Sequence, residues 1–238
     1  MSSRERLDER YRKYAADHPG VSYAEWMNIL QVDALTKGGE HATLGPNLRK
    51  YPNWWDAGSN AFYRYQRTFP ILPRSRVLDY GCGSLRIGGH FIRYLDPGHY
   101  FGLDVGMGFI DMGKALVGDA LLAQKMPRFA SIDEDSVRDA VAFDADIVCS
   151  NAVSYHVHPD EAPLYFANLA RIAHKPGATL FFDASVSDAP VDKLQLSMPV
   201  DYFKQALPGL HFEMFHKIDN RSESNQIVGI MEFKVPPA

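Results

Sequence analysis

Hydrophobic positions in the first third of the chain recur with a helical period. The segment from Arg4 to Ala16 repeats its apolar residues at spacings of four and three, which predicts a polar helix with one apolar stripe. Ser22 followed by Glu25 is a capping-box pattern, so a second helix is predicted from Tyr23 to about Thr36. Aromatic residues at helical spacing predict a third helix over residues 62–69.

From residue 76 onward the pattern changes to short apolar runs that alternate with amphipathic segments. The predicted strands cover residues 76–81, 99–106, 128–132, 145–153, 178–185, 210–218 and 225–235, and the predicted helices cover 87–95, 109–122, 160–173 and a short stretch after 199. This alternation predicts a doubly wound α/β fold with a mostly parallel, Rossmann-like sheet of about seven strands. The last two strands have no helix between them, which predicts an antiparallel C-terminal edge. The change near Pro73 divides the chain into an N-terminal helical extension, residues 1–72, and an α/β domain, residues 73–238.

Composition narrows the classes of function. Apolar residues make up 46% of the chain and aromatic residues 12%, which is enough for a large core. The formal net charge of -4 carries no overall signature of binding to nucleic acid or to an anionic membrane. No apolar run approaches the roughly 20 residues of a membrane-spanning helix, and the charged start lacks a secretory signal. Since there are only two cysteines, no disulfide framework is expected, and we expect a soluble, cytoplasmic protein.

A glycine turn after the first predicted strand is the most informative motif. Gly81 and Gly83 would let the backbone approach a ligand closely at the start of a helix. A dinucleotide fingerprint needs a third glycine where Arg86 stands, so the pyrophosphate-binding pattern fails. Asp79 beside the turn would instead balance a cationic ligand, and Asp104, 21 residues beyond Gly83, has the spacing of a ribose-binding acid. A nucleoside with a cationic group and no phosphates fits this set, and S-adenosylmethionine is such a ligand.

Four segments carry a resemblance to a known family. VLDYGCGSLRIG resembles the first motif of class I S-adenosylmethionine-dependent methyltransferases, and FGLDVG resembles their acidic motif on the second strand. DIVCSNAVSYHV resembles the fourth-strand motif, and RIAHKPGATLFF the segment that leads into strand five. The GCGSLR form is similar to an uncharacterised subgroup, with Leu85 where many relatives have a third glycine. The resemblance implies a catalytic domain over 73–238 and a helical lid within 1–72.

The resemblance also assigns cofactor-binding residues. They are Asp79, Gly81, Cys82 and Gly83 at the methionyl end, Asp104 at the ribose hydroxyls, Val105 beside the adenine, Asp133 at the adenine amino group and Asn151 at the sulfonium end. The competing interpretation makes Asp79 and Asp104 turn-capping acids. The competing interpretation of Asp133 is an acid in a solvated loop with no contact to the cofactor.

A histidine is the residue type best suited to take a proton from a hydroxyl or acidic N–H acceptor, because its pKa lies near neutrality. His156 and His158 follow the fourth strand, at the edge where ligands bind in open α/β sheets, and His156 is the predicted catalytic base. The alternative is that His156 packs against or caps the next helix, and we expect His158, before Pro159, to be exposed. His156, His158 and Asp160 lack a matching set of oxygen ligands, so we expect no metal.

Aromatic residues gather before the first strand of the α/β domain. Trp54, Trp55, Tyr63 and Tyr65 either cover the cofactor and line the acceptor site, or bind the N-terminal helices to the sheet. The leading prediction for the whole chain is a methyltransferase that acts on a small molecule at oxygen or nitrogen. The alternatives are a protein acceptor and a non-catalytic module that binds S-adenosylmethionine. The chain has no excess of basic residues, and its fourth strand lacks the Asn/Asp-Pro-Pro-Tyr/Phe pattern. Both observations argue against a nucleic-acid acceptor.

Overall fold

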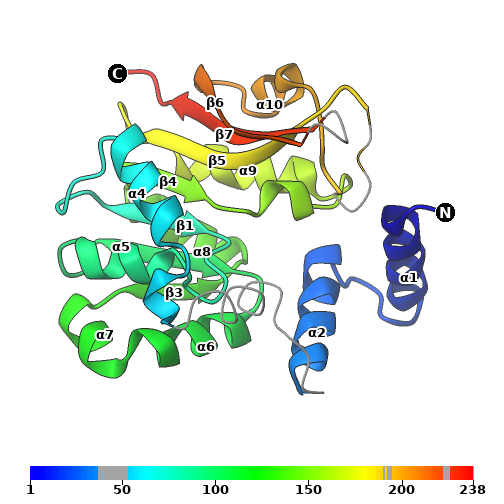
Figure 1. The fold of residues 1–238 in the computed structure, drawn as a ribbon, viewed down its shortest axis with the longest axis horizontal. Coiled ribbons are helices and arrows are strands. Elements are labelled where there is room, and N and C mark those ends of the chain that lie inside the picture. Colours follow the sequence, from blue (N-terminus) through cyan, green and yellow to red (C-terminus); the bar gives the residue numbers. More distant parts are fainter. Residues whose placement is uncertain (37–52, 190, 192–194, 222–225, 238) are drawn as a thin grey trace. The chain divides into compact units, whose positions relative to one another are not determined.

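The computed structural model describes residues 1–36, 53–189, 191, 195–221 and 226–237. The chain forms two compact units: Met1–Met27 with Ser150–Ala238, and Asn28–Cys149. Figure 1 shows the elements in chain order, which are α1 (Ser3–Asp17), α2 (Tyr23–Thr36), η1 (Trp54–Asp56), α4 (Ser59–Thr68), β1 (Val77–Tyr80), α5 (Gly88–Tyr94), β2 (Tyr100–Asp104), α6 (Met107–Val117), α7 (Asp119–Lys125), β3 (Arg128–Ser131), α8 (Glu134–Ala142), β4 (Ile147–Ser150), η2 (Ser154–His156), α9 (Ala162–Ile172), β5 (Thr179–Val186), α10 (Val200–Ala206), β6 (His211–Arg221) and β7 (Gln226–Lys234). The predicted functional division at residues 72 and 73 stays a prediction.

The seven strands form one sheet in the order β3-β2-β1-β4-β5-β7-β6, which confirms the predicted doubly wound fold. β1 runs parallel to both β2 and β4, and β2 runs parallel to β3. β7 pairs antiparallel with β5 and with β6, so the antiparallel C-terminal edge is also confirmed. β1 and β2 are buried at every position, as expected for central parallel strands, and the chain order reverses beside β1. Ligands in such sheets bind at the carboxyl ends of the strands around this reversal.

Two details of the helices differ from the predictions. The helix predicted over 109–122 is two helices, α6 and α7, because Gly118 between them has a φ of +90°. The helix α8 lies where no element was predicted. Its sequence signal is Asp133, which forms a capping box with Ser136 at the start of the helix.

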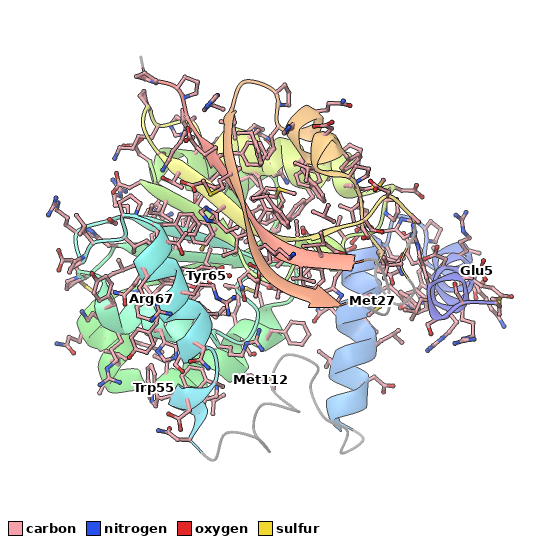
Figure 2. All side chains as sticks on the ribbon, turned by 45° about the horizontal axis from the view of Figure 1, so that its top comes forward. Glu5, Met27, Trp55, Tyr65, Arg67 and Met112 are labelled. Atoms are coloured by element: carbon pink, nitrogen blue, oxygen red, sulfur yellow. The ribbon has the colours of Figure 1, made fainter. Side chains whose placement is uncertain are left out.

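Aromatic packing joins α4 to α5 within the second unit. The ring of Phe62 stacks on His90 with centroids 5.4 Å apart, and Trp54 lies so close to α5 that a Cβ added at Gly89 would be 2.6 Å from its ring. Trp54 and Tyr65 are buried, whereas Tyr63 is 53% exposed. Tyr65 and Trp55 are labelled in Figure 2. For Trp54 and Tyr65 the structure therefore shows a packing role, and a lid remains a prediction for this segment.

The N-terminal residues of the first unit pack on the segment that follows η2. The capping box of Ser22 and Glu25 forms as predicted, with the Ser22 N–H donating to Oε2 of Glu25 at 2.8 Å. The next residue, Tyr23, donates its backbone N–H to Glu161 and accepts a hydrogen bond from the Gln195 amide at 2.9 Å. His158 lies 5.0 Å from the Tyr23 ring and is 4% exposed, so the expected exposure of His158 is wrong. The sequence places it before a proline, but tertiary contacts enclose it.

Candidate functional site

The turn after β1 has the backbone conformation that its glycines predict. Gly81 and Gly83 both have positive φ values, +85° and +52°. The backbone N–H groups of Gly81 and Cys82 donate to the carbonyl of Leu103 on β2, at 2.7 and 2.9 Å. A Cβ added at Gly83 would meet nothing within 4 Å, so the glycine borders open space. The turn therefore offers bare backbone to a ligand, as the sequence predicts.

Leu85 has a backbone conformation that favours glycine. Its φ is +58°, in the left-handed region, and its side chain is completely buried. A Cβ added at Gly113 of α6 would lie 2.7 Å from the Leu85 side chain, so this leucine packs directly against that helix. The leucine at this position therefore costs backbone strain, and its buried apolar contact with α6 offsets that cost.

Replacing Leu85 with glycine is expected to destabilise the protein less than replacing it with alanine. Both variants lose the buried leucine side chain, at a cost of about 2–5 kcal/mol. Only glycine relieves the left-handed conformation, which costs other residues roughly 1–2 kcal/mol. Urea unfolding of the two variants measures the difference. If the alanine variant proves the more stable, Leu85 is not strained in solution.

Asp104, the last residue of β2, joins the glycine turn after β1 to the loop after β2. Its Oδ2 accepts the N–H of Gly83 at 2.7 Å, and its Oδ1 accepts the N–H of Gly106 at 3.1 Å. The residue is 7% exposed, and burial raises its pKa above the ordinary value. The hydrogen bonds from Gly83, Gly106 and Val105 act in the opposite direction but do not offset the effect of burial. A carboxylate has about four lone-pair sites, so beyond these three N–H groups Asp104 can accept one further hydrogen bond, from a ligand hydroxyl. Asp104 therefore caps both loops and retains one acceptor site for a ribose hydroxyl.

Asp79 lies within β1, in a buried polar group. The phenol of Tyr100 donates to its Oδ2 at 2.8 Å, and no backbone N–H of the turn is among its hydrogen bonds that the structure describes. Burial raises the pKa of Asp79 to about 7, and the nearby charge of Asp104 contributes. A positively charged ligand group would favour the ionised form of this carboxyl.

The contribution of Asp79 to the stability of the ligand-free protein is expected to fall as pH rises from about 4 to about 7. In this range Asp79 holds a proton in the folded state, with a pKa of about 7, but loses it in the unfolded state, with a pKa of about 3.8, so rising pH favours unfolding. Asp79→Asn cannot ionise and keeps an acceptor for Tyr100. Its melting temperature should therefore gain on that of the wild type between pH 5 and pH 8. If the melting temperatures of the two proteins differ by the same amount at every pH from 5 to 8, the raised pKa of Asp79 is contradicted.

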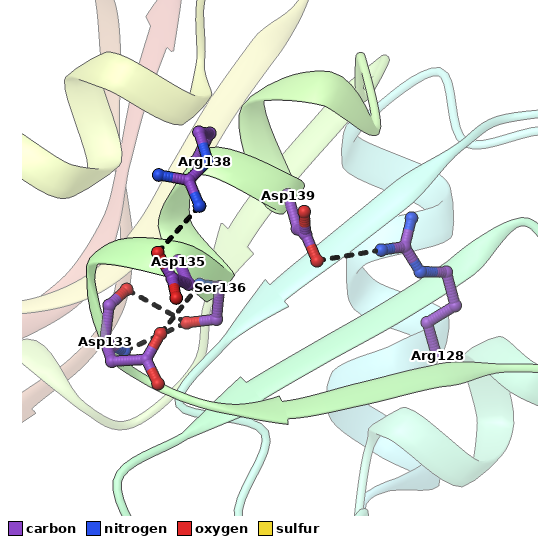
Figure 3. A network of polar contacts seen from close by, with 6 residues as sticks. All are labelled: Arg128, Asp133, Asp135, Ser136, Arg138 and Asp139. Atoms are coloured by element: carbon purple, nitrogen blue, oxygen red, sulfur yellow. Dashed lines mark hydrogen bonds and ion pairs between the residues drawn. The ribbon is translucent and has the colours of Figure 1, made fainter.

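Three further predicted cofactor residues lie in the same unit. Cys82 is buried, and burial raises the pKa of its thiol well above the ordinary value, so the thiol is neutral. Val105 is partly exposed on the loop after β2. Asp133 accepts the Ser136 N–H at 2.7 Å through Oδ1 as the cap of α8, within the polar network of Figure 3. One oxygen of Asp133 thus serves the helix, and its contact with adenine stays a prediction.

The chain after β4 is held by Asp183, a residue of β5 that sequence reasoning missed. Oδ2 of Asp183 accepts the Asn151 amide at 2.6 Å and the Ala152 N–H at 3.3 Å, and its carbonyl accepts the Ser154 hydroxyl. Ala152 has a φ of +57°, so this turn is held in a strained conformation. The amide orientation leaves Oδ1 of Asn151 as an acceptor. An acid inside the apolar run LFFDAS was the available signal.

His156 and His158 lie in different surroundings, although only two positions separate them. His156 is exposed, yet the protein around its ring lowers its pKa by desolvation, and among the described residues the ring has no hydrogen-bond partner. An unbonded, neutral imidazole can accept a proton at neutral pH. The His158 Nδ1 accepts the Asp160 N–H at 3.2 Å, and its Nε2 lies 3.6 Å from Asp8. The buried His158 therefore has a packing role.

Two features are absent from the described part of the chain. No group of three or more His, Cys, Asp or Glu residues there could hold a metal ion. Within the same residues, no helix is both long and apolar enough to cross a membrane.

The described groups fit a nucleoside that carries a positive charge. Asp104 provides an acceptor for a ribose hydroxyl, the turn at Gly83 provides open backbone, and the buried Asp79 provides a carboxyl whose ionised form a cation would favour.

No family model matches the chain. It is 31% identical over 169 residues to a ubiquinone biosynthesis O-methyltransferase of Hahella chejuensis (strain KCTC 2396), a match that covers 66% of this chain and 67% of the relative. It is 29% identical over 108 residues to the probable methyltransferase ltbC of Aspergillus luteorubrus, which covers 44% of this chain and only 38% of that protein. Among solved structures, magnesium protoporphyrin IX methyltransferase (ChlM) from Synechocystis PCC 6803 with bound SAH has the same fold. The TM-score is 0.60 at 14% identity, over 89% of this chain and 97% of that one.

Proposed function

Because this chain belongs to the class I S-adenosylmethionine-dependent methyltransferases, we propose that it transfers a methyl group from this cofactor to a small molecule, at oxygen or nitrogen. The observation that carries the proposal is Asp104, whose two oxygens join the glycine turn to the loop after β2 and which can accept one further hydrogen bond. The relative from Hahella chejuensis, a ubiquinone biosynthesis O-methyltransferase, supports a small acceptor with a hydroxyl group.

The chain's own residues would hold the cofactor at both ends. Asp104 would accept a hydrogen bond from a ribose hydroxyl, and Val105 and Asp133 would border the adenine. Asp79 and the turn at 81–83 would bind the methionyl end, where the ionised carboxyl balances positive charge. Asn151, held by Asp183, would face the sulfonium end. When bound, the cofactor supplies an electrophilic methyl group on a positively charged sulfur.

His156 would remove the acceptor's proton. At an unprotonated nitrogen, its neutral ring would accept the proton of the acceptor's O–H or N–H group. The lowered pKa of His156 keeps the ring unprotonated at neutral pH. As the pH falls through the lowered pKa of His156, which lies below the ordinary 6.5, protonation of this base would lower the rate.

Calorimetry and a methyl-transfer assay test the proposed function. The protein is expected to bind S-adenosylmethionine and S-adenosylhomocysteine, and not NAD. Labelled S-adenosylmethionine is then incubated with a panel of phenols, carboxylic acids and amines, and in parallel with proteins. Label in a small molecule supports the proposal. Binding of NAD alone, or label only in protein, would refute it.

Deleting residues 1–53 is expected to leave a folded sheet with impaired turnover. The deletion removes α1 and Tyr23, which cover the segment around His158, two residues beyond the proposed base. Circular dichroism would show the retained fold, and steady-state kinetics would show the lost turnover. A truncated protein with full activity and full cofactor affinity would exclude a lid or a supporting role for this segment.

A further inference from the structure

Asn28 of α2 brings a buried oxygen without a partner to the loop that follows β2. Among the residues that the structure describes, no donor reaches Oδ1 of Asn28, although the atom is buried. A Cβ added at Gly106 would lie 2.4 Å from this oxygen and 2.7 Å from the amide nitrogen. The amide of Asn28 therefore lies directly against the backbone of Gly106.

The approach of Asn28 also explains the glycine at position 106. The backbone there has a φ of -121° and a ψ of 101°, which is extended and open to any residue. The backbone conformation therefore does not explain the glycine. Any larger residue at this position would clash with the Asn28 amide. The N–H of Gly106 donates to Oδ1 of Asp104, so Asn28 lies against the loop that orders the proposed ribose-binding carboxylate.

A buried acceptor without a donor costs free energy in the folded state, so the atom requires an explanation, and a bound ligand is one. The missing partner must be an O–H or N–H group beside the loop at Gly106, whose own N–H donates to Asp104. We propose that Asn28 is a further cofactor-binding residue, whose Oδ1 accepts a hydrogen bond from a ribose hydroxyl of the S-adenosyl group. This inference rests on the proposed function, because it takes the ligand of Asp104 to be that nucleoside.

Two variants of matched shape separate the oxygen acceptor from the packing of the side chain. Asn28→Leu keeps the approximate volume and removes the acceptor, and Asn28→Asp keeps an acceptor oxygen. Calorimetry with S-adenosylhomocysteine should show affinity weakened about three- to tenfold for Asn28→Leu, the range of one neutral hydrogen bond. Asn28→Asp should stay closer to the wild type, and the exposed Asn60→Ala of α4 serves as the unaffected control.

A second probe locates the hydrogen bond on the ligand. 5′-Methylthioadenosine retains the adenosine part and lacks the amino-acid end. Asn28→Leu should weaken the binding of both probes by the same factor. A loss confined to S-adenosylhomocysteine would overturn the ribose assignment, and unchanged binding of both probes would overturn the inference.

The stability of the ligand-free variant gives a readout that a packing role would not share. Removing an unsatisfied buried oxygen should leave the melting temperature of Asn28→Leu equal to that of the wild type or higher. A structural asparagine would lower it on replacement, which would contradict the inference. Opposite changes in stability and affinity are thus the expected signature.

A double-mutant cycle with Gly106→Ala tests the contact itself. The added Cβ should displace the Asn28 amide, so Gly106→Ala should weaken binding of S-adenosylhomocysteine about as much as Asn28→Leu does. In the double variant that combines Gly106→Ala with Asn28→Leu, the two losses should not add. Additive losses would place Asn28 away from the loop and overturn the inference. If the wild type itself fails to bind S-adenosylhomocysteine, the proposed function fails instead.

Discussion

Replacing His156 with alanine is expected to lower the rate of methyl transfer to an oxygen acceptor by roughly 10²–10⁴-fold, the usual contribution of a general base. The ring has no hydrogen-bond partner among the described residues, and its surroundings lower its pKa by desolvation, so a neutral base is available at pH 7. The affinity for S-adenosylhomocysteine should hardly change, because the proposed cofactor contacts come from other residues. Single-turnover kinetics at saturating cofactor measures the rate directly.

Two histidines serve as controls for this experiment. His211 on β6 is exposed, and its replacement by alanine should leave the rate unchanged. His158 is buried beside Tyr23 and Asp8, so His158→Ala should lower the melting temperature. Near-full turnover by His156→Ala on the true acceptor would show that this enzyme relies on positioning alone or on an acceptor already nucleophilic at neutral pH.

Replacing Asp104 with alanine is expected to weaken S-adenosylhomocysteine binding roughly 10- to 150-fold, the range for hydrogen bonds to a charged group. The variant loses the proposed acceptor of a ribose hydroxyl. It also frees the N–H groups of Gly83 and Gly106, so the two loops lose the carboxylate that joins them. Calorimetry at pH 8 measures the loss.

A more conservative variant and an exposed acid complete the comparison. Asp104→Asn should fall between alanine and the wild type, because one of its two side-chain atoms is a donor and would face an N–H. Asp111 on α6 is exposed and pairs with Lys114 at 3.2 Å, so Asp111→Ala should bind normally. Unchanged affinity in Asp104→Ala would remove the observation that carries the proposed function.

Local sequence was sufficient for the parts of this protein that depend on near neighbours along the chain. Continuous apolar runs predicted the buried central strands, because a parallel strand covered on both faces needs no polar positions. The capping box of Ser22 and Glu25 predicted the start of α2, because its hydrogen bonds span only three residues. The glycine turn and Asp104 were readable for the same kind of reason: the turn needs positive φ, and the acid stands at a regular spacing beyond it.

Tertiary structure alone decided the features that join distant segments. The backbone of Leu85 accepts a left-handed conformation because α6 holds its side chain, and no local pattern encodes that contact. Asp183 orients Asn151 across 32 residues, and Asn28 meets Gly106 across 106 − 28 = 78 residues, so neither pairing follows from periodicity. His158 is buried because Asp8 and Tyr23 of the N-terminal helices lie against it, whereas His156 is exposed. Periodicity reports which face of an element is apolar, but the partner of each side chain depends on how the whole chain packs.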